Sequence, residues 1–256
     1  MNDAPRRPVA LVTGASRGIG AATVRALANE FDVVAAARDV AALKALAAET
    51  GATPMAFDAT RDVDIDALGD LDIDAAVLNQ GIITSARPFH EQGRDEIDRQ
   101  IAVNLRASMA AARVLLPAMI ARGSGHLVFL TSLMARHPFA NAAIYGATKA
   151  GLHGFAQALR VDLAGTGVRV SEISPGRVET DIWNEALGGD TAAIRDNIFG
   201  PYRALTPAEV AATIRAVMTL PPHVDANLVE LSPTDQAVGG AVFAKRRQTA
   251  AGGGAA

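Results

Sequence analysis

Short runs of β-branched or alanine-rich residues alternate along the chain with longer segments of helical period. Seven runs have the length and composition of strands: residues 9–13, 33–37, 53–57, 75–78, 127–131, 168–173 and 228–231. Helices are expected in the intervals between them. Regular alternation of strand and helix predicts a mostly parallel sheet with helices on both faces, joined by right-handed crossovers. The predicted fold class is therefore α/β, with a doubly wound sheet of about seven strands.

Two intervals break this alternation. Between the third and fourth predicted strands only residues 64–68 have a helical pattern, so the helix there is expected to be short. Residues 181–203 lose any regular period, which is typical of a mobile lid. A helix is expected to begin after Thr206, because Pro207 and Glu209 complete a capping-box pattern. The lid collects glycine and aromatic residues: Gly188, Gly189, Trp183, Phe199 and Tyr202.

Length and composition narrow the class of protein. The chain has 256 residues, 50% of them apolar, so residues 1–248 are expected to form a single domain with one substantial core. The Ala/Gly-rich residues 249–256 are expected to be a disordered tail. The basic residues 245–247 are either a solvated charge run or a contact for a phosphate or a neighbouring subunit.

Charge and cysteine content exclude several partners. A formal net charge of -3 gives no positive field for nucleic acid. The chain has no cysteine, which excludes disulfides and cysteine-bound metals and agrees with a reducing compartment. No export signal or membrane-spanning segment is apparent in the sequence. We therefore expect a cytoplasmic protein without a metal, membrane or nucleic-acid partner.

A glycine-rich turn follows the first predicted strand. Gly14, Gly18 and Gly20 have the spacing G-x-x-x-G-x-G and lead into a segment of helical period. Glycines here let the backbone turn tightly and let a pyrophosphate approach the helix amino terminus, where N–H groups and the helix dipole favour anions. An ordinary strand-to-helix turn has a similar composition, so the motif alone leaves both interpretations open.

The residue after the second predicted strand indicates which dinucleotide would bind. An acidic side chain there bonds the ribose 2'-hydroxyl, whereas a basic one accommodates a 2'-phosphate. Arg38 occupies this place and Arg17 lies in the glycine turn, so two guanidinium groups can converge on one phosphate. They predict NADP, although a shift of one position would bring Asp39 there and favour NAD. Asp58, after the third strand, is either an acceptor for the adenine amino group or a turn cap.

A phenol and an amine are spaced for proton transfer in residues 144–164, a segment of helical period. Tyr145 and Lys149 are four residues apart and therefore share one helical face. An ammonium beside the phenol is expected to lower the pKa of Tyr145 below its usual value near 10, which makes it a usable acid and base. Ser132 follows the fifth strand, where its hydroxyl can hold a substrate oxygen. Asn104, a poor helix former within residues 97–119, is either a surface residue or a functional one.

As a set, these residues resemble the short-chain dehydrogenase/reductase family over residues 9–235. The resemblance implies a Rossmann-like fold and hydride transfer between NADP and a carbonyl or secondary alcohol. It also implies that Ser132 and Tyr145 bind the carbonyl oxygen, that Lys149 lowers the tyrosine pKa and holds the nicotinamide ribose, and that Asn104 anchors a proton-relay water. The implied cofactor-binding residues are Gly14, Ser16, Arg17, Gly18, Ile19, Gly20, Arg38, Asp58, Ala59, Asn79, Gly81, Tyr145, Lys149, Pro175, Gly176, Val178 and Thr180.

Within that family, the chain looks most like the NADP-dependent 3-hydroxy acid (serine) dehydrogenase branch, over residues 144–149, 167–176 and 204–236. It departs from the family at Leu78 and Gln80, which replace the usual asparagine and alanine of Asn-Asn-Ala-Gly. This departure leaves the detail of the cofactor pocket open. The resemblance also implies a homodimer or homotetramer built through the helical segments 97–119 and 144–164, although both segments are also suited to covering the sheet alone.

The sequence leaves the identity of the substrate open. A hydroxy acid would need a cation near the pocket mouth, and Arg136, His137 and Arg177 lie on suitable loops, where they are otherwise solvated charges. The lid aromatics would suit a bulkier ketone instead, or serve only to pack the lid down. A small ketone or aldehyde is a further alternative substrate. One alternative function is a 3-ketoacyl-thioester reductase, which should have a basic entrance patch that the sequence does not show. Another is a non-catalytic NADP-binding sensor, which would not need Tyr145 beside Lys149.

Overall fold

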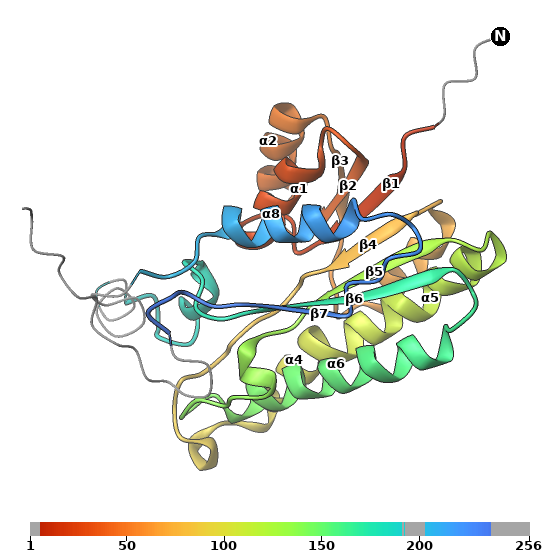
Figure 1. Ribbon diagram of the computed structural model, residues 1–256. Helices are drawn as coiled ribbons and strands as arrows, with labels where there is room; N and C mark the ends of the chain where they lie inside the picture. Colours follow the sequence, from red (N-terminus) through yellow and green to blue (C-terminus); the bar gives the residue numbers. More distant parts are fainter. Residues whose placement is uncertain (1–5, 191, 193–202, 237–256) are drawn as a thin grey trace, which may run out of the picture.

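In the computed structural model, which describes residues 6–190, 192 and 203–236, the sheet confirms the predicted α/β class. Seven parallel strands lie in the order β3-β2-β1-β4-β5-β6-β7 (Figure 1). Every predicted strand is present, with ends that differ by at most two residues from prediction. The strands are β1 Val9–Thr13, β2 Asp32–Ala37, β3 Thr53–Ala56, β4 Ala75–Leu78, β5 Gly125–Leu130, β6 Val168–Pro175 and β7 Leu228–Leu231.

Helices cover both faces of the sheet, as Figure 1 shows, with α1, α2 and α8 on one side and α4, α5 and α6 on the other. Each face has its own apolar core, because side chains of the buried central strands alternate between the two faces. The helices are α1 Gly18–Leu27, α2 Val40–Thr50, α3 Asp62–Asp66, α4 Arg94–Ile101, α5 Ala107–Ala121, α6 Ala143–Asp162 and α8 Pro207–Met218.

Strand β1 lies in the interior of the sheet, next to the central strand β4, and helps to determine where a ligand can bind. It pairs with β2 on one side and with β4 on the other. Strands β2 and β3 are thus added on one side of β1 and strands β4 to β7 on the other, so the strand order reverses between β1 and β4. In open α/β sheets the crevice beyond the carboxyl ends of the strands at such a reversal is the binding site. The residues that follow β1, β4, β5 and β6 are therefore brought to one edge.

The predicted helix over residues 97–119 is longer and less regular than expected. It begins at Arg94, one turn earlier, and a π-helical turn, Ala102–Arg106, separates α4 from α5. The run Arg94–Ala121 is long enough to cross a membrane, and an 18-residue window within it, with a mean hydropathy of 1.2, is apolar enough by composition alone. In this fold it packs against the sheet as a core helix, through buried residues that include Ala111, Leu115 and Met119.

Two local predictions are confirmed. The short helix after β3 is α3, followed by a 3₁₀ turn, Ala67–Asp70. The capping box at the start of α8 is present, because the Thr206 N–H donates to Glu209 Oε2 over 2.7 Å and the Glu209 N–H donates to Thr206 Oγ1 over 3.3 Å. Much of the predicted lid, with Phe199 and Tyr202, lies outside the described residues, as do the basic residues 245–247 and the tail.

Candidate active site

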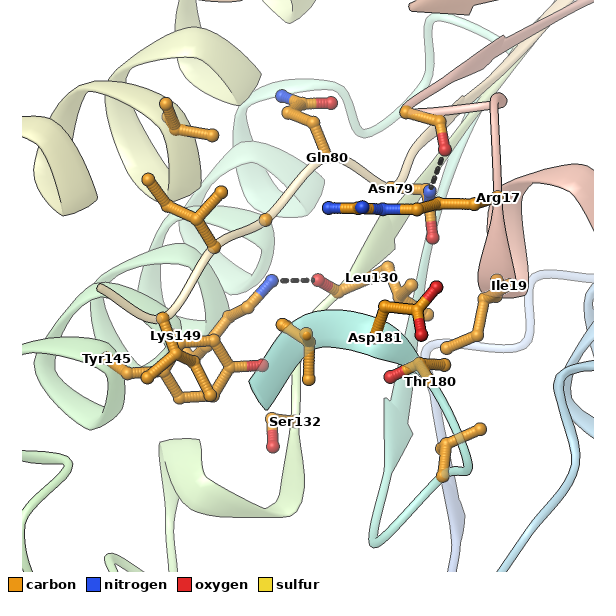
Figure 2. Close-up of a pocket in the computed structure, with 18 of the residues that line it drawn as sticks. Arg17, Ile19, Asn79, Gln80, Leu130, Ser132, Tyr145, Lys149, Thr180 and Asp181 are labelled. Atoms are coloured by element: carbon orange, nitrogen blue, oxygen red, sulfur yellow. Dashed lines mark hydrogen bonds between the residues drawn. The ribbon is translucent and has the colours of Figure 1, made fainter. Parts of the chain in front are cut away.

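A cavity of about 400 Å³ lies at the carboxyl edge of the sheet and extends from the glycine turn to Tyr145 (Figure 2). Its wall comes from the segments that follow β1, β2, β3, β4, β5 and β6 and from the start of α6. All the proposed cofactor-binding residues line it except Gly20, which is buried behind the glycine turn. The structure thus brings together residues that are far apart in the sequence.

The glycine turn has a backbone that only glycine adopts readily. Gly14 and Gly18 have φ angles of +62° and +55°. A Cβ atom on Gly20 would lie 2.2 Å from the Gly14 carbonyl oxygen, so the helix and the strand approach more closely than a side chain allows. Helix α1 begins at Gly18, and its N-cap residue, Arg17, makes no side-chain capping bond. Its first N–H groups can therefore bind a phosphate.

The departure at Gln80 leaves this turn intact. The Asn79 side-chain nitrogen donates to the Thr13 and Gly14 carbonyl oxygens over 3.0 Å and 3.2 Å. Gln80 is buried, accepts a hydrogen bond from the Thr13 hydroxyl and donates to Ser108 Oγ over 2.9 Å. The larger side chain is thus bonded at both ends to protein groups and ties β1 to α5.

Two arginines lie where the adenosine end of a dinucleotide would be held. The side chains of Arg17 and Arg38 are exposed and line the cavity. Asp39, the rival residue for that place, is the N-cap of α2, and its carboxylate accepts from the Ala42 N–H over 3.0 Å. The carboxylate is therefore committed to a helix end, and the guanidinium groups fit the extra phosphate of NADP.

Asp58 caps its own turn and also lines the cavity. Its Oδ1 accepts from the Thr60 N–H over 2.9 Å and from the Thr60 hydroxyl over 2.7 Å. The Thr60 backbone bond is the largest cause that lowers the pKa of Asp58, and the nearby Arg38 and Arg61 charges add to it. The turn-cap interpretation is confirmed, and contact with an adenine amino group stays a prediction.

Tyr145 and Ser132 meet at the other end of the cavity (Figure 2). Tyr145 is only 8% exposed, and the Ser132 hydroxyl is within hydrogen-bonding reach of the phenol. Burial raises the pKa of Tyr145 to about 12, and the Ser132 bond opposes this only in part. The expected lowering of this pKa is therefore wrong for the structure, because loss of hydration outweighs the hydrogen bond from Ser132.

Lys149 lies beside Tyr145, as its spacing predicted, but its amine is hydrogen-bonded to the backbone at the end of β5. The Nζ atom donates to the Leu130 carbonyl oxygen over 2.7 Å and lies 5.7 Å from the centre of the Tyr145 ring (Figure 2). Burial lowers the pKa of Lys149 to about 8, and the negative charge of Glu172 works against that fall. The carboxyl end of β5 thus fixes the amine at the floor of the cavity.

Asn104 is fully buried in the π-helical turn, so it is not a surface residue. Its Oδ1 accepts from the Ile82 N–H over 2.8 Å. Its Nδ2 donates to the Ile82 carbonyl oxygen over 2.9 Å and to Thr148 Oγ1 over 3.2 Å. The side chain therefore holds the loop after β4 against α6 from behind the cavity wall. A Cβ on Gly81, in that loop, would lie 3.5 Å from Lys149 Nζ.

The surroundings of Tyr145 are mostly apolar and include residues that the sequence did not indicate. The 3₁₀ helix Asp181–Trp183 forms part of the wall, and an ion pair between Arg99 and Glu185 ties the segment after it to α4. Loop residues far apart in sequence have no spacing that would reveal such a cluster. The apolar group around Tyr145 consists of Ile83, Met134, Ala142, Phe139, Ile182, Trp183 and Ala186.

Of the three cations considered for a carboxylate, Arg177 alone lines the cavity. It is half-buried, and its guanidinium carbon lies 5.9 Å from the centre of the Phe139 ring. Arg136 instead forms an ion pair with Glu230 on β7, and neither it nor His137 is part of the wall. The candidate site thus has two arginines and a helix amino terminus at one end and a hydroxyl, a phenol and an arginine at the other.

The chain is similar to known proteins in both sequence and fold. A family model described as short chain dehydrogenase matches residues 8–189. The serine 3-dehydrogenase of Agrobacterium fabrum is 35% identical over 90% of this chain and 95% of its own length. The NADP-dependent 3-hydroxy acid dehydrogenase YdfG of Escherichia coli is 33% identical over 91% of this chain and 97% of its own length. A serine dehydrogenase structure in a closed form with NADP+ superposes with a TM-score of 0.86 and 32% identity, covering 94% of this chain and 100% of that one.

Proposed function

The chain belongs to the short-chain dehydrogenase family and is an NADP-dependent oxidoreductase that acts on CH–OH groups, and from this premise we propose that Ser132, Tyr145, Lys149 and Asn104 carry out its chemistry. The observation that supports this assignment is the meeting of Ser132 and Tyr145 at the end of a cavity that starts at the glycine turn. A carbonyl oxygen placed there has two hydroxyl donors within reach.

NADP, when bound, supplies or accepts the hydride. Residues of the chain transfer the proton and bind the reacting oxygen. Tyr145 gives a proton to the carbonyl oxygen during reduction and takes one from the alcohol during oxidation, while Ser132 holds that oxygen. The high pKa of Tyr145 keeps the phenol protonated at neutral pH, so that it is ready as an acid. Lys149 holds a positive charge beside the phenol, which stabilises the phenolate left after proton transfer.

Cofactor binding follows the same edge of the sheet. We propose that the N–H groups at the start of α1 bind the pyrophosphate and that Arg17 and Arg38 bind the 2'-phosphate. The proposed contacts near the nicotinamide come from the segment after β6. They are Pro175, Gly176, Val178 and Thr180.

We propose a small 3-hydroxy acid as the substrate, with Arg177 as the contact for its carboxylate. Arg177 lies in the wall of the cavity that Ser132 and Tyr145 also line, and its half-buried position strengthens attraction for an anion. The named activities of the 3-hydroxy acid dehydrogenase relatives support this class. The apolar cluster around Tyr145 favours a substrate whose remaining substituent is also small and apolar.

A panel of 3-hydroxy acids, ketones and aldehydes, each assayed with NADPH or NADP+ and with NADH or NAD+, tests this proposal. We expect the highest kcat/KM for a 3-hydroxy acid with NADP+. Tyr145→Phe should abolish turnover while NADPH binding, followed by its fluorescence, is retained. Turnover that survives in Tyr145→Phe would remove Tyr145 from the mechanism. Binding of NADPH without turnover of any substrate by the wild type would favour the sensor.

We also propose a cytoplasmic homodimer or homotetramer whose subunits meet through α4, α5 and α6. Large apolar side chains are exposed on these helices, namely Ile101, Met109, Ile120 and Val161. Such side chains gain free energy when a second copy covers them. A single domain over residues 1–248 is proposed because one sheet takes its strands from Val9 to Leu231.

A further inference from the structure

A buried carboxylate lies on the sheet behind the proposed catalytic lysine. Glu172, on β6, is 1% exposed and lies on the face of the sheet that α6 covers, since Val168 and Val170 of the same strand pack into the core on that face. Its Oε1 accepts from the Thr131 hydroxyl over 2.6 Å. Its Oε2 lies 2.7 Å from His153 Nδ1, on α6. Both carboxylate oxygens are therefore bound to protein groups.

The carboxylate and the Lys149 amine are fastened to consecutive residues of the chain. Lys149 Nζ donates to the Leu130 carbonyl oxygen, and Thr131, the next residue, donates to Glu172. His153 lies one helical turn beyond Lys149, so Tyr145, Lys149 and His153 recur at four-residue spacing along α6. One helix face thus carries the phenol, the amine and the partner of the buried carboxylate.

A buried carboxylate remains costly even when both of its oxygens are hydrogen-bonded, and a nearby buried cation lowers that cost. An apolar residue of similar size would fill this part of the core at lower cost, since ion pairs in a core are often no more stabilising than apolar contacts. Lys149 is itself buried, and its amine donates to a carbonyl oxygen; within the described residues no carboxylate forms an ion pair with it. A negative charge nearby offsets the cost of charging that amine.

We propose that Glu172 is a positioning residue that keeps Lys149 in its charged form, and that Thr131 and His153 fix its carboxylate for this purpose. The proposal rests on the proposed roles of Tyr145 and Lys149. Glu172 touches neither substrate nor cofactor, because it is not part of the cavity wall. It acts through the electric field that it exerts on the amine.

Among the described residues, several charged groups on elements packed against α6 have partners of their own. From the π-helical turn, Arg106 pairs with Asp62, and from α4, Arg99 pairs with Glu185. From β6, Arg169 donates to the Val224 carbonyl oxygen. On α6 itself the titratable neighbours are Tyr145 and His153. The other charged or acidic residues of α4 are Arg94, Asp95, Glu96 and Asp98, Arg113 lies on α5, and the 3₁₀ helix after β5 contributes none.

The two opposing effects on the pKa of Lys149 agree with this role. Burial lowers the pKa of Lys149 to about 8, and Glu172 is the charge that raises it. Removal of the Glu172 charge should therefore lower this pKa further, so that the amine loses its proton within the neutral range. The field proposed to stabilise the Tyr145 phenolate would then disappear within the neutral range.

The test measures the amine directly. The chain has three lysines, Lys44, Lys149 and Lys245, so the ¹³Cε signals of labelled lysine can be assigned with Lys44→Arg and Lys245→Arg variants. In NADP-free protein, Glu172→Gln should lower the pKa of Lys149 by about one pH unit. If the amide variant does not fold, Glu172→Met removes the same charge without leaving a buried polar group.

Two control variants separate charge from structure. Glu172→Asp retains the negative charge and should keep the Lys149 pKa closer to that of the wild type. Asp225→Asn removes a carboxylate that bonds to Ser171 on the same strand, and it should leave the Lys149 pKa unchanged. An unchanged Lys149 pKa in folded Glu172→Gln, or an equal fall in Asp225→Asn, would overturn the proposal.

The pH profile of turnover provides the second readout. In Glu172→Gln the alkaline limb of kcat for ketone reduction should move to lower pH, in step with the Lys149 titration. A uniform loss of kcat without such a shift indicates a structural role and contradicts the proposal. The proposed function fails separately, if Tyr145→Phe retains turnover, whatever the Glu172 variants do.

Discussion

At the scale of single residues, burial controls the chemistry of the site more than spacing does. The four-residue interval correctly placed Tyr145 and Lys149 on one helix face. It did not reveal that both groups are almost fully buried, at 8% and 2% exposure. Burial favours the neutral form of each group, so it raises the pKa of the phenol and lowers the pKa of the amine.

The lowered pKa of Lys149 should make stability depend on pH. The amine titrates at about 8 in the folded protein and near 10.5 in the unfolded chain, so the unfolded state binds more protons between these values. The contribution of Lys149 to the free energy of unfolding should therefore rise between pH 8 and pH 10.5. Below pH 8 it should be about 3 kcal/mol less favourable than above pH 10.5. Denaturant unfolding of wild type and Lys149→Met across this range checks it. A difference between the two proteins that does not change with pH would contradict the prediction.

Arg38 should decide the choice between the two dinucleotides. Arg38→Ala removes one of two guanidinium groups available to a 2'-phosphate, and the KM for NADPH should rise about tenfold or more, which corresponds to about 1.4 kcal/mol. The KM for NADH should change little, because NADH lacks that phosphate. Arg25→Ala is the matched control, since Arg25 pairs with Glu49 on α2. Equal losses with both cofactors would contradict a role for Arg38 in phosphate binding.

At the scale of elements, local sequence signals were reliable where a backbone needs a particular residue. The capping box at Thr206, the short α3 and the glycine turn all follow from neighbouring residues. The π-helical turn had no such signal, because it depends on the contacts that bury Asn104 against the loop after β4. Helix interruptions of this kind are often found at functional sites.

The close packing of the glycine turn should make Gly20→Ala harmful to cofactor binding. The added Cβ would clash with the Gly14 carbonyl oxygen at 2.2 Å, and the turn would have to shift away from its anion-binding geometry. We expect the Kd for NADPH, measured by fluorescence, to rise at least tenfold. Gly154→Ala, in α6, is the control, since its Cβ would meet no atom within 4 Å. An unchanged Kd in Gly20→Ala would show that the turn does not contact the cofactor.

At the scale of the whole molecule, the parallel sheet assembles the site. Residues that follow six different strands line one cavity because the carboxyl ends of parallel strands all lie at the same edge. Helices α4, α5 and α6 cover one face of the sheet in Figure 1, and large apolar side chains on them are exposed. This apolar surface is where we propose that further copies of the chain associate.

Met109→Glu should therefore weaken self-association without loss of the fold. Met109 is 40% exposed on α5, and a charge there would oppose burial against a second subunit. We expect a lower mass in sedimentation velocity than for the wild type. The control is Val63→Glu, because Val63 is 62% exposed on α3, outside the proposed interface. A wild-type chain that sediments as a monomer would rule out the proposed interface.

The sequence by itself determined the strands, the order of strand and helix, the glycine turn and the residues expected at the site, because these depend on periodicity, on propensity and on motifs within a few residues. Only the tertiary structure decided which cation lines the cavity, where the Lys149 amine points and how burial changes the pKa values. It also decided that Arg136 pairs with Glu230 and that Glu172 lies behind the lysine. Electrostatic fields and loss of hydration act between groups that are close in space, and closeness in space across a sheet is not encoded in local spacing.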